Sequence, residues 1–475
     1  MSVVASDAAP ESGATQRGAI GIPTWAGIAA YAAPVTGGFF FYIPMWSILP
    51  GVYAKYFGLQ LSSIATVVLS VRIFDGIVIP AVGYLSDRHC RKGGSRKPWI
   101  VAGYAGVILA CRFLFAPQHA VSAIYYLSWS IAYFLCFAIA DIPHVTWGNE
   151  LTLEYQLRAK VVAVRNVMLR LGIIVFYAMP LLPWYATSEY TPQVLHDAVY
   201  VGAALLIAGL IWTLRSAPPG IVVRTAWADS PRLLVRSVLA NKPLLVHFAA
   251  VFFAGMCFGM WYSVLYFFVD GYLGRGAQIP LMFLVGFSIA ALSTPIWLRL
   301  VRRLGKSTTW AIGLALLALQ SIVAWFVTPA APGWVPFALV IAANLTFVAN
   351  DVAGVSIIGD IVDYGKLKFN KDRGSTYVSL INLMFQVALG IGGGVAIGLT
   401  ARFGFSATDS THSDHAILGM KLGFAILPLI FGLIAMFAIS RTPISRSRHL
   451  VIQRRMESRV VTGATVALAS EAGQR

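Results

Sequence analysis

The chain has 475 residues, of which 58% are apolar and 12% are charged, and its formal net charge is +17. Soluble globular domains carry about 25% charged residues, so this chain has too few charges to cover a large water-exposed surface. Its cations lie between long apolar runs instead of on one polar face, which argues against nucleic-acid binding. The composition therefore excludes an ordinary soluble protein and predicts a chain embedded in a lipid bilayer.

Twelve apolar runs follow one another, each about long enough to cross ~30 Å of hydrocarbon as a helix. They are continuous and not alternating, which predicts helices instead of a barrel. The runs cover residues 24–47, 61–85, 99–117, 121–145, 162–184, 195–214, 243–268, 279–300, 308–329, 334–358, 377–400 and 420–440. We therefore expect an all-α membrane protein with twelve transmembrane helices.

Lys and Arg residues gather on one side of this predicted topology. Thirty of the 36 lie in the two tails and the even-numbered connections, where Arg165 and Arg170 are counted with the connection before the fifth run. The opposite side holds four: Lys55, Arg275, Arg402 and Lys421. The positive-inside rule then places both termini in the cytoplasm, in a multi-pass protein of the cell inner membrane.

The longest interior connection, residues 215–242, divides the runs six and six. The predicted organisation is a cytoplasmic N-tail (1–23), a six-helix bundle (24–214), a cytoplasmic linker (215–242), a second six-helix bundle (243–440) and a cytoplasmic C-tail (441–475). This is the architecture of the major facilitator superfamily, in which solute binds between the halves near the bilayer midplane.

The first 23 residues lack an apolar core, so we expect a polar tail and not a cleaved signal peptide. The four cysteines are spaced too irregularly for a disulfide framework or a zinc site. No nucleophile–base pair, phosphate loop or cluster of metal ligands stands out. The sequence thus predicts neither an enzyme nor a bound cofactor or metal.

Ionisable residues inside the apolar runs are candidates for function, because each costs at least ~2.5–3.5 kcal/mol on insertion scales. Arg72 and Asp75 share one helical face, either as a tethering ion pair or as part of a solute or cation pathway. Asp141 precedes Pro143, whose ring frees backbone carbonyls, so it either faces water at a helix end or recognises hydroxyls. Further candidates are Arg112, Asp351, Asp360 and Asp363.

Aromatic residues in the first and seventh runs are candidates to stack on sugar rings. Tyr and Trp suit this role because they combine an apolar face with a polar tip. We single out Tyr42 and Trp46 in the first run and Trp261 and Tyr262 in the seventh. Lipid-facing and packing roles stay open for each of them.

Four segments resemble known motifs. GYLSDRHCRK (83–92) resembles the signature between helices 2 and 3 of the major facilitator superfamily. Three blocks are similar to the glycoside–pentoside–hexuronide:cation symporters, the melibiose permease-like branch of that superfamily. They are RIFDGIVIPAVGYLSD with GGSRKPW (72–99), ADIPHVTWGNELTLEYQLRAKVVAVR (140–165) and GDIVDYGKLKFNKDRGSTYVSLINLMFQVALGIGGG (359–394). The resemblance covers nearly the whole chain.

This resemblance implies roles for individual residues. Asp75 with Arg72 would serve cation or proton coupling, and Asp87, Arg88 and Arg91 would form an inner gate. The implied solute-binding residues, together with the aromatic candidates, are Asp141, Arg165, Lys368, Tyr42, Trp46, Trp261 and Tyr262.

Departures from the family pattern bear on the coupling ion and the solute. Three positions that would supply oxygen ligands to sodium hold Val78, Ile79 and Ala138. A hard cation needs several oxygens, so the resemblance favours a proton over sodium. Phe39 and Val145 stand where the family has a carboxylate and a tryptophan, which predicts a more apolar or bulkier solute than a galactoside.

The leading interpretation is therefore a monomeric secondary active transporter that symports a glycoside, oligosaccharide or related solute with a cation by alternating access. Its partners would be that small solute, the coupling cation and the lipid bilayer. One alternative is a transporter of a lysolipid or other amphiphile, which would need a laterally open apolar cleft. Another is a membrane sensor or accessory protein that transports nothing.

Overall fold

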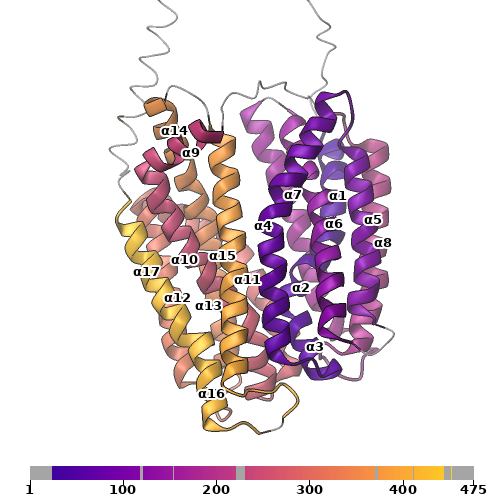
Figure 1. Ribbon diagram of the computed structural model, residues 1–475, viewed down its shortest axis with the longest axis vertical. Helices are drawn as coiled ribbons and strands as arrows, with labels where there is room; N and C mark the ends of the chain where they lie inside the picture. Colours follow the sequence, from indigo (N-terminus) through magenta and orange to yellow (C-terminus); the bar gives the residue numbers. More distant parts are fainter. Residues whose placement is uncertain are drawn as a thin grey trace, which may run out of the picture.

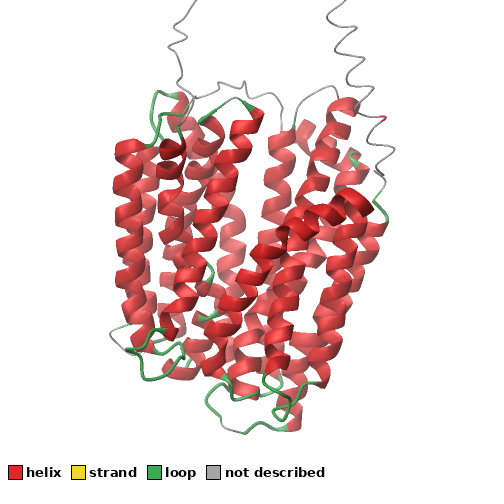
Figure 2. Cartoon of the chain, turned by 180° about the vertical axis from the view of Figure 1, so that it is seen from behind, coloured by secondary structure: helices red, strands yellow, loops and turns green. Residues whose placement is uncertain are grey.

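A computed structural model describes residues 24–117, 121–152, 154–220, 231–369, 373–409, 411–442 and 451. The predicted N-tail, residues 221–230 of the predicted linker, and all but three residues of the predicted C-tail lie outside the described residues. Within the described part, twelve helical segments are long and apolar enough to cross a membrane. The prediction of twelve spanning helices is therefore confirmed, and the described regular structure is helical throughout (Figure 2).

The N-terminal half of the chain forms one bundle, drawn in indigo to magenta in Figure 1. Its elements are α1 (Trp25–Tyr42), α2 (Pro44–Ser47), α3 (Leu49–Phe57), α4 (Leu61–Arg91), α5 (Lys97–Phe115), α6 (Ala123–Glu150), α7 (Tyr155–Ala178), η1 (Met179–Leu181) and α8 (Pro192–Ser216). Pro44 and Leu49 begin the short helices α2 and α3, which continue the first span and cover one end of the bundle.

The C-terminal half forms the second bundle beside the first (Figure 1). Its elements are α9 (Pro231–Ala240), α10 (Lys242–Tyr266), η2 (Phe267–Tyr272), η3 (Gly276–Gln278), α11 (Ile279–Leu304), α12 (Lys306–Phe326), α13 (Trp334–Ala349), η4 (Asn350–Gly354), α14 (Val355–Phe369), α15 (Gly374–Arg402), α16 (Asp414–Lys421), η5 (Leu422–Ile426) and α17 (Leu427–Ser440). We call the two ends of the molecule the α9 end and the α3 end.

Several helices run past the edges that the apolar runs predict. Helix α4 continues to Arg91 and α14 to Phe369, so the charges predicted to lie in connections are on the last turns of helices. Helix α7 already begins at Tyr155, and Arg165 and Arg170 therefore lie inside a span and not before it. The predicted apolar run 162–184 also contains both arginines, so their count as connection charges is corrected; each of them faces an acidic side chain.

The predicted linker contains a helix that the sequence analysis did not anticipate. Helix α9 precedes α10 and is separated from it by Asn241, whose side chain accepts a hydrogen bond from the Leu244 backbone N–H. Val235 and Leu239 lie one turn apart and are exposed, whereas Ser237 is buried. The connection between the halves thus contains a helix at the α9 end of the second bundle.

Glycines on α15 let this helix pack closely on both bundles. A Cβ at Gly392 would lie 2.2 Å from the Met256 carbonyl oxygen of α10, and one at Gly390 would overlap the side chain of Arg72 on α4. Small residues allow helix backbones to approach closely in membranes, where packing drives association. Helix α15 therefore joins the C-terminal bundle to α4 of the N-terminal bundle.

We expect Gly259→Ala to lower the thermal unfolding midpoint of the detergent-solubilised protein. A Cβ at Gly259 of α10 would lie 1.8 Å from the Leu389 carbonyl oxygen of α15, so the two helices must separate. Overpacking of this kind costs about 1–3 kcal/mol.

Gly359→Ala is the matched control, because nothing lies within 4 Å of a Cβ at this exposed position in α14. Replacing glycine by alanine inside a helix stabilises it by about 0.5–1 kcal/mol, so the midpoint should hold or rise. Equal midpoints for the two variants would show that α10 and α15 are not tightly packed.

Candidate functional site

A cavity of about 520 Å³ lies between the two bundles and is lined by residues of both. This volume is within the ~300–1,000 Å³ of typical small-molecule sites. Its aromatic lining residues are Phe39, Tyr42, Trp46, Tyr262, Phe287, Phe347 and Phe385. Its polar lining residues are Ser47, Asn166, Arg170, Thr294, Asn344, Asp351 and Gln386. The cavity thus offers apolar ring faces together with hydrogen-bonding groups, and it holds three of the four aromatic candidates.

Polar contacts cross and brace this cavity. The hydroxyl of Tyr42 on α1 donates to Oε1 of Gln386 on α15 at 3.4 Å, which links the halves. The hydroxyl of Tyr262 donates to Oδ1 of Asn344 at 3.2 Å, and the Asn344 amide donates in turn to the Val340 carbonyl. The sequence analysis did not identify Asn344 or Gln386 as candidates, because each is a single neutral side chain in a long apolar run.

Two charges face each other across the same cavity. Arg170 Nη2 of α7 lies 4.0 Å from Asp351 Oδ2 of η4, and both side chains are partly exposed to the cavity. The distance is too long for a direct hydrogen bond. Asp351 was a sequence candidate, whereas Arg170 was missed because it was assigned to a connection.

Arg72 and Asp75 form a close ion pair within α4, with Arg72 Nη1 3.0 Å from Asp75 Oδ2. Both side chains are buried, and Arg72 is only 3% exposed. The guanidinium carbon lies 5.0 Å from the ring centre of Trp46 and 4.6 Å from that of Phe134. Cation–π contacts and the carboxylate together stabilise this charge where little water reaches it. The pair lies behind Trp46, beside the cavity and not in its lining.

Asp141 and Arg165, which come from the same family-like segment (140–165), meet inside the N-terminal bundle. Arg165 Nη2 on α7 contacts Asp141 Oδ1 on α6 at 2.5 Å, and the guanidinium lies 5.7 Å from the ring centre of Phe39. Neither residue lines the cavity, and Phe39 lies between the pair and the cavity. The two charges are therefore one side chain away from the cavity.

The structure does not bring Lys368 or Trp261 to the cavity. Lys368, at the end of α14, donates from Nζ to the Ala240 carbonyl oxygen of α9 at 2.7 Å. Trp261 is fully buried behind Tyr262 and stacks on Phe424 at 5.5 Å between ring centres. Their predicted solute contacts remain predictions that this geometry does not support.

At the α9 end, where the sequence predicts a gate, two acidic side chains contact one arginine. Arg96 Nη2 contacts Asp87 at 2.9 Å and Glu150 at 2.6 Å, and its Nε donates to Glu150 at 2.8 Å. Burial acts to lower the pKa of Arg96, but the hydrogen bonds that Arg96 donates to Glu150 and Asp87 outweigh it and raise that pKa overall. All three residues belong to the N-terminal bundle, while Arg88 is exposed. Arg96, in the GGSRKPW motif, and Glu150 were not among the predicted gate residues.

At the α3 end, a charge cluster joins the two halves. Lys55 Nζ on α3 lies 3.0 Å from Glu189 of the N-terminal bundle and 2.9 Å from Asp270 of η2. Burial alone lowers the pKa of Lys55, but the bonds to Asp270 and Glu189 raise it overall, so the ammonium stays charged across physiological pH. Beside the cluster, Gly51 packs against the ring of Tyr266, where a Cβ would not fit. These contacts close the cavity toward the α3 end.

We expect Lys55→Met to open the α3 end, because it removes the cation that holds Asp270 to the N-terminal half. A cysteine introduced at Thr294, a partly exposed residue of the cavity wall, would report this opening. Its labelling by a membrane-impermeant maleimide applied from the α3 side should become severalfold faster.

Lys55→Arg keeps the charge and serves as the matched control, with the protein lacking the Thr294 substitution as background for the native cysteines. Equal labelling rates in the Met and Arg variants would contradict a closing role for the cluster.

Comparisons with known proteins agree with this arrangement. A family model described as MFS/sugar transport protein matches residues 26–446. The chain is 23% identical to uncharacterized symporter YnaJ of Bacillus subtilis (strain 168), over 86% of this chain and 89% of that protein. It is 23% identical to the glucuronide carrier protein homolog of Escherichia coli (strain K12), over 86% and 90%. It is also 23% identical to the isoprimeverose transporter of Lactiplantibacillus pentosus, over 81% of each chain.

Solved structures share the fold. A substituted form of nucleoside transporter NupG aligns with a TM-score of 0.67 at 12% identity, covering 88% of this chain and 100% of that one. A bacterial homolog of the human lysosomal transporter Spinster, inward-facing and unoccupied, aligns with a TM-score of 0.64 at 14% identity, covering 88% and 98%.

Two six-helix bundles around a shared cavity define a multi-pass membrane protein with the fold of the major facilitator secondary transporters. The chain belongs to the MFS/sugar transport family, whose model matches almost all of its described residues.

Proposed function

We propose that this transporter moves a glycoside, an oligosaccharide or a related polyhydroxylated solute through the central cavity together with a cation. The observation that carries the proposal is the lining of that cavity. Tyr42, Trp46 and Tyr262 present ring faces, and Asn166, Asn344 and Gln386 present donors and acceptors for hydroxyl groups. Sugars have both an apolar ring face and many hydroxyls, so this mixture suits them.

Relatives support the same solute class. Their names include an isoprimeverose transporter, a lactose permease and a putative glycoside/cation symporter. The aromatic share of the cavity, with Phe39, Phe287, Phe347 and Phe385 among its walls, favours a solute with a substantial apolar face. An aryl or alkyl glycoside, or a disaccharide, fits that description better than a small polyol.

Coupling to a proton is favoured over coupling to sodium. Val78 and Ala138, which replace oxygen ligands of the related symporters, pack together in an apolar cluster with Val82. Sodium needs several oxygens around it, whereas a proton needs one carboxylate. In this proposal Asp75 carries the coupling proton and Arg72 holds its charge between cycles.

The remaining predicted residues take supporting roles. Asp141 and Arg165 would reach the solute when Phe39 moves, since Arg is suited to planar hydrogen-bonded recognition. Asp87 and the arginines that follow it would stabilise the α9 end through exposed ion pairs, which are weak enough to break in each cycle. The protein acts as a monomer in the cell inner membrane, with both termini and the α9 end cytoplasmic.

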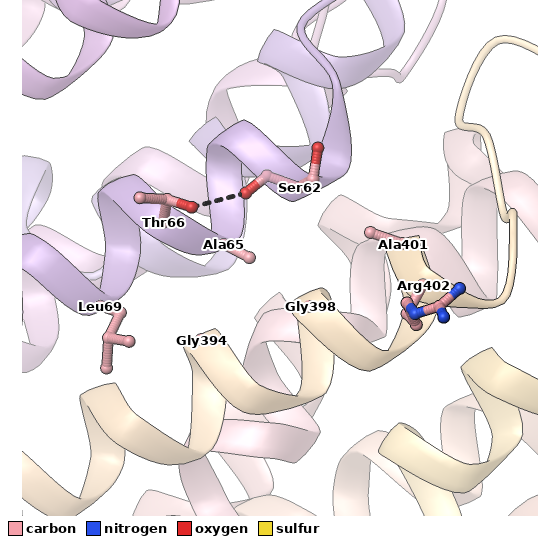
Figure 3. A pocket seen from close by; sticks show the side chains of 8 residues that line it. All are labelled: Ser62, Ala65, Thr66, Leu69, Gly394, Gly398, Ala401 and Arg402. Carbon is pink, nitrogen blue, oxygen red and sulfur yellow. Dashed lines mark hydrogen bonds between the residues drawn. The ribbon is translucent and has the colours of Figure 1, made fainter.

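An amphiphile transporter is the second candidate, because a laterally placed groove exists. It runs between α4 and α15, which lie side by side at the front of Figure 1, and Figure 3 shows its walls. The groove is open because Gly394 and Gly398 lack side chains, and Ser62, Thr66 and Arg402 also line it. These small and polar walls offer little apolar surface to an acyl chain, so the central cavity remains the favoured path.

Flux into proteoliposomes tests the proposed function. We expect uptake of at least one of lactose, isoprimeverose and methyl β-D-glucuronide. An imposed proton gradient should raise its accumulation severalfold, and a sodium gradient should not.

Liposomes without protein are the control. Uptake of lysophosphatidylcholine alone would favour the amphiphile transporter, and a lack of flux with every probe would favour a sensor or accessory protein.

Asp75→Asn tests the coupling role of Asp75. We expect accumulation against a gradient to be lost while solute counterflow persists, since exchange needs no net movement of cations. The change also leaves buried Arg72 without its counter-charge, at a cost of about 3–5 kcal/mol in stability. The double variant Arg72→Gln with Asp75→Asn removes both charges and separates the two effects. Unchanged accumulation in both variants would exclude Asp75 as the coupling residue.

A further inference from the structure

The Arg170–Asp351 ion pair lines the cavity and joins the two halves, unlike the two ion pairs of the N-terminal bundle described above. Asp351 belongs to the C-terminal bundle and Arg170 to the N-terminal bundle. Their side chains are 43% and 34% exposed. By comparison, Arg72 and Asp75 lie on one helix and are buried, and Asp141 and Arg165 lie within one bundle. A movement of one bundle against the other therefore changes the Arg170–Asp351 distance and leaves the other two pairs intact.

The backbone at Asp351 departs from a regular helix. Residues Asn350–Gly354 form a π-helical turn between α13 and α14, in the middle of the tenth span. An extra residue in a turn shifts the register of the side chains, and such turns are frequent at functional sites. Here Asp351 lies in the cavity wall, while Ala353 and Gly354 are buried, with Gly354 against Trp310.

The charged surroundings of Asp351 are simple. Helix α7 contributes Arg170, and α10 contributes the phenol of Tyr262, which lines the same cavity. The parts of α11 and α13 in the cavity wall are uncharged, including Thr294 and Asn344.

Farther along α12 and α14, Lys306 and Asp360 contact each other at 2.6 Å. Asp363 and Lys366 lie about one and two turns after Asp360 on α14, and each has contacts of its own. Arg170 is therefore the cation that faces Asp351 in the described part of the cavity.

We propose that Asp351 is a proton-binding site of the transport cycle, separate from Asp75, and that Arg170 reports its protonation to the opposite half. The step is a reversible proton transfer: water in the cavity delivers a proton, and an O–H bond forms on the carboxylate. Arg170 keeps its charge, so the pair changes from neutral to singly positive. The electrostatic attraction between Arg170 and Asp351, which links the two halves, is then lost. The Arg170 guanidinium becomes available to solute oxygens.

This assignment rests on the proposed function only for its link to transport, because the binding of a proton needs no solute. Infrared difference spectroscopy of the purified protein in detergent tests it directly. A protonated carboxyl group has its own C=O stretching band, which appears as the pH is lowered. We expect part of this band to be missing in Asp351→Asn.

Arg170→Gln should keep the Asp351 part of the band but move its midpoint to higher pH, because the cation that favours the carboxylate is gone. Arg170→Lys should keep the midpoint near that of the unmodified protein. Asp409→Asn, at an exposed carboxylate in the connection before α16, is the matched control for loss of a carboxyl group outside the cavity. An unchanged band in Asp351→Asn, or an unchanged midpoint in Arg170→Gln, would overturn the proposal.

Transport assays then distinguish a failure of this proton-site proposal from a failure of the proposed transport function. With the same three sugar probes, Asp351→Asn should retain counterflow and lose at least tenfold in accumulation driven by a proton gradient. Full accumulation by Asp351→Asn would overturn the coupling role. A band that responds as expected, in a protein that carries none of the probes, would support the proton site and overturn the proposed solute class.

Discussion

A charge left unpaired in hydrocarbon costs several kcal/mol, and this chain places a series of charges inside its spans. The cost is met by pairing: Arg72 with Asp75, Arg165 with Asp141, and Arg170 with Asp351. Arg112 instead donates to the Ala116 carbonyl at its own helix end. Because each partner must lie on a particular helix face, the two pairs between helices constrain how α6, α7 and η4 are turned toward one another.

The pairs differ in what they can do. The Arg72–Asp75 pair is closed off by Trp46, Phe134 and the backbone of Gly390, which makes it a rigid part of the seam between α4 and α15. The Arg170–Asp351 pair has a longer separation and cavity on its open side. The other two pairs lie within the N-terminal bundle and help to hold its shape, whereas the Arg170–Asp351 pair lies between the bundles, where they must part. A transporter needs both kinds of contact, because alternating access moves intact bundles around a fixed site.

Much of this architecture follows from the sequence, because hydropathy and cation distribution report directly on the bilayer. The twelve spans were predicted correctly, but the contact between Asp141 and Arg165 was not anticipated, since each was considered only as a solute contact. The apolar run 162–184 included Arg165 and Arg170, yet both were also counted with the preceding connection, and Arg170 was not considered as a site residue. Asn344 and Gln386 escaped notice because one amide barely changes the hydropathy of a long run.

Other features depend on register and distance, which a single sequence does not encode openly. Lys368 matches a family position, yet it lies at the end of α14 and bonds to Ala240, because α9 fills the space beside it. The Lys55 cluster joins three segments far apart in the chain, and no motif marks it. The π-helical turn at Asn350–Gly354 has an ordinary helical sequence around it, so the placement of Asp351 emerges only in three dimensions.

The three π-helical segments of the described chain, η2, η4 and η5, all belong to the C-terminal bundle. Such turns widen the helix and weaken its regular hydrogen-bond ladder, which makes them points where a helix bends with little resistance. The two bundles therefore have different kinds of bending point: these π-helical turns in the C-terminal bundle, and the prolines inside α1, α4 and α6 in the N-terminal bundle. A change in bilayer thickness would act on the C-terminal spans at the π-helical turns, which ties the geometry around Asp351 to the lipid composition of the membrane.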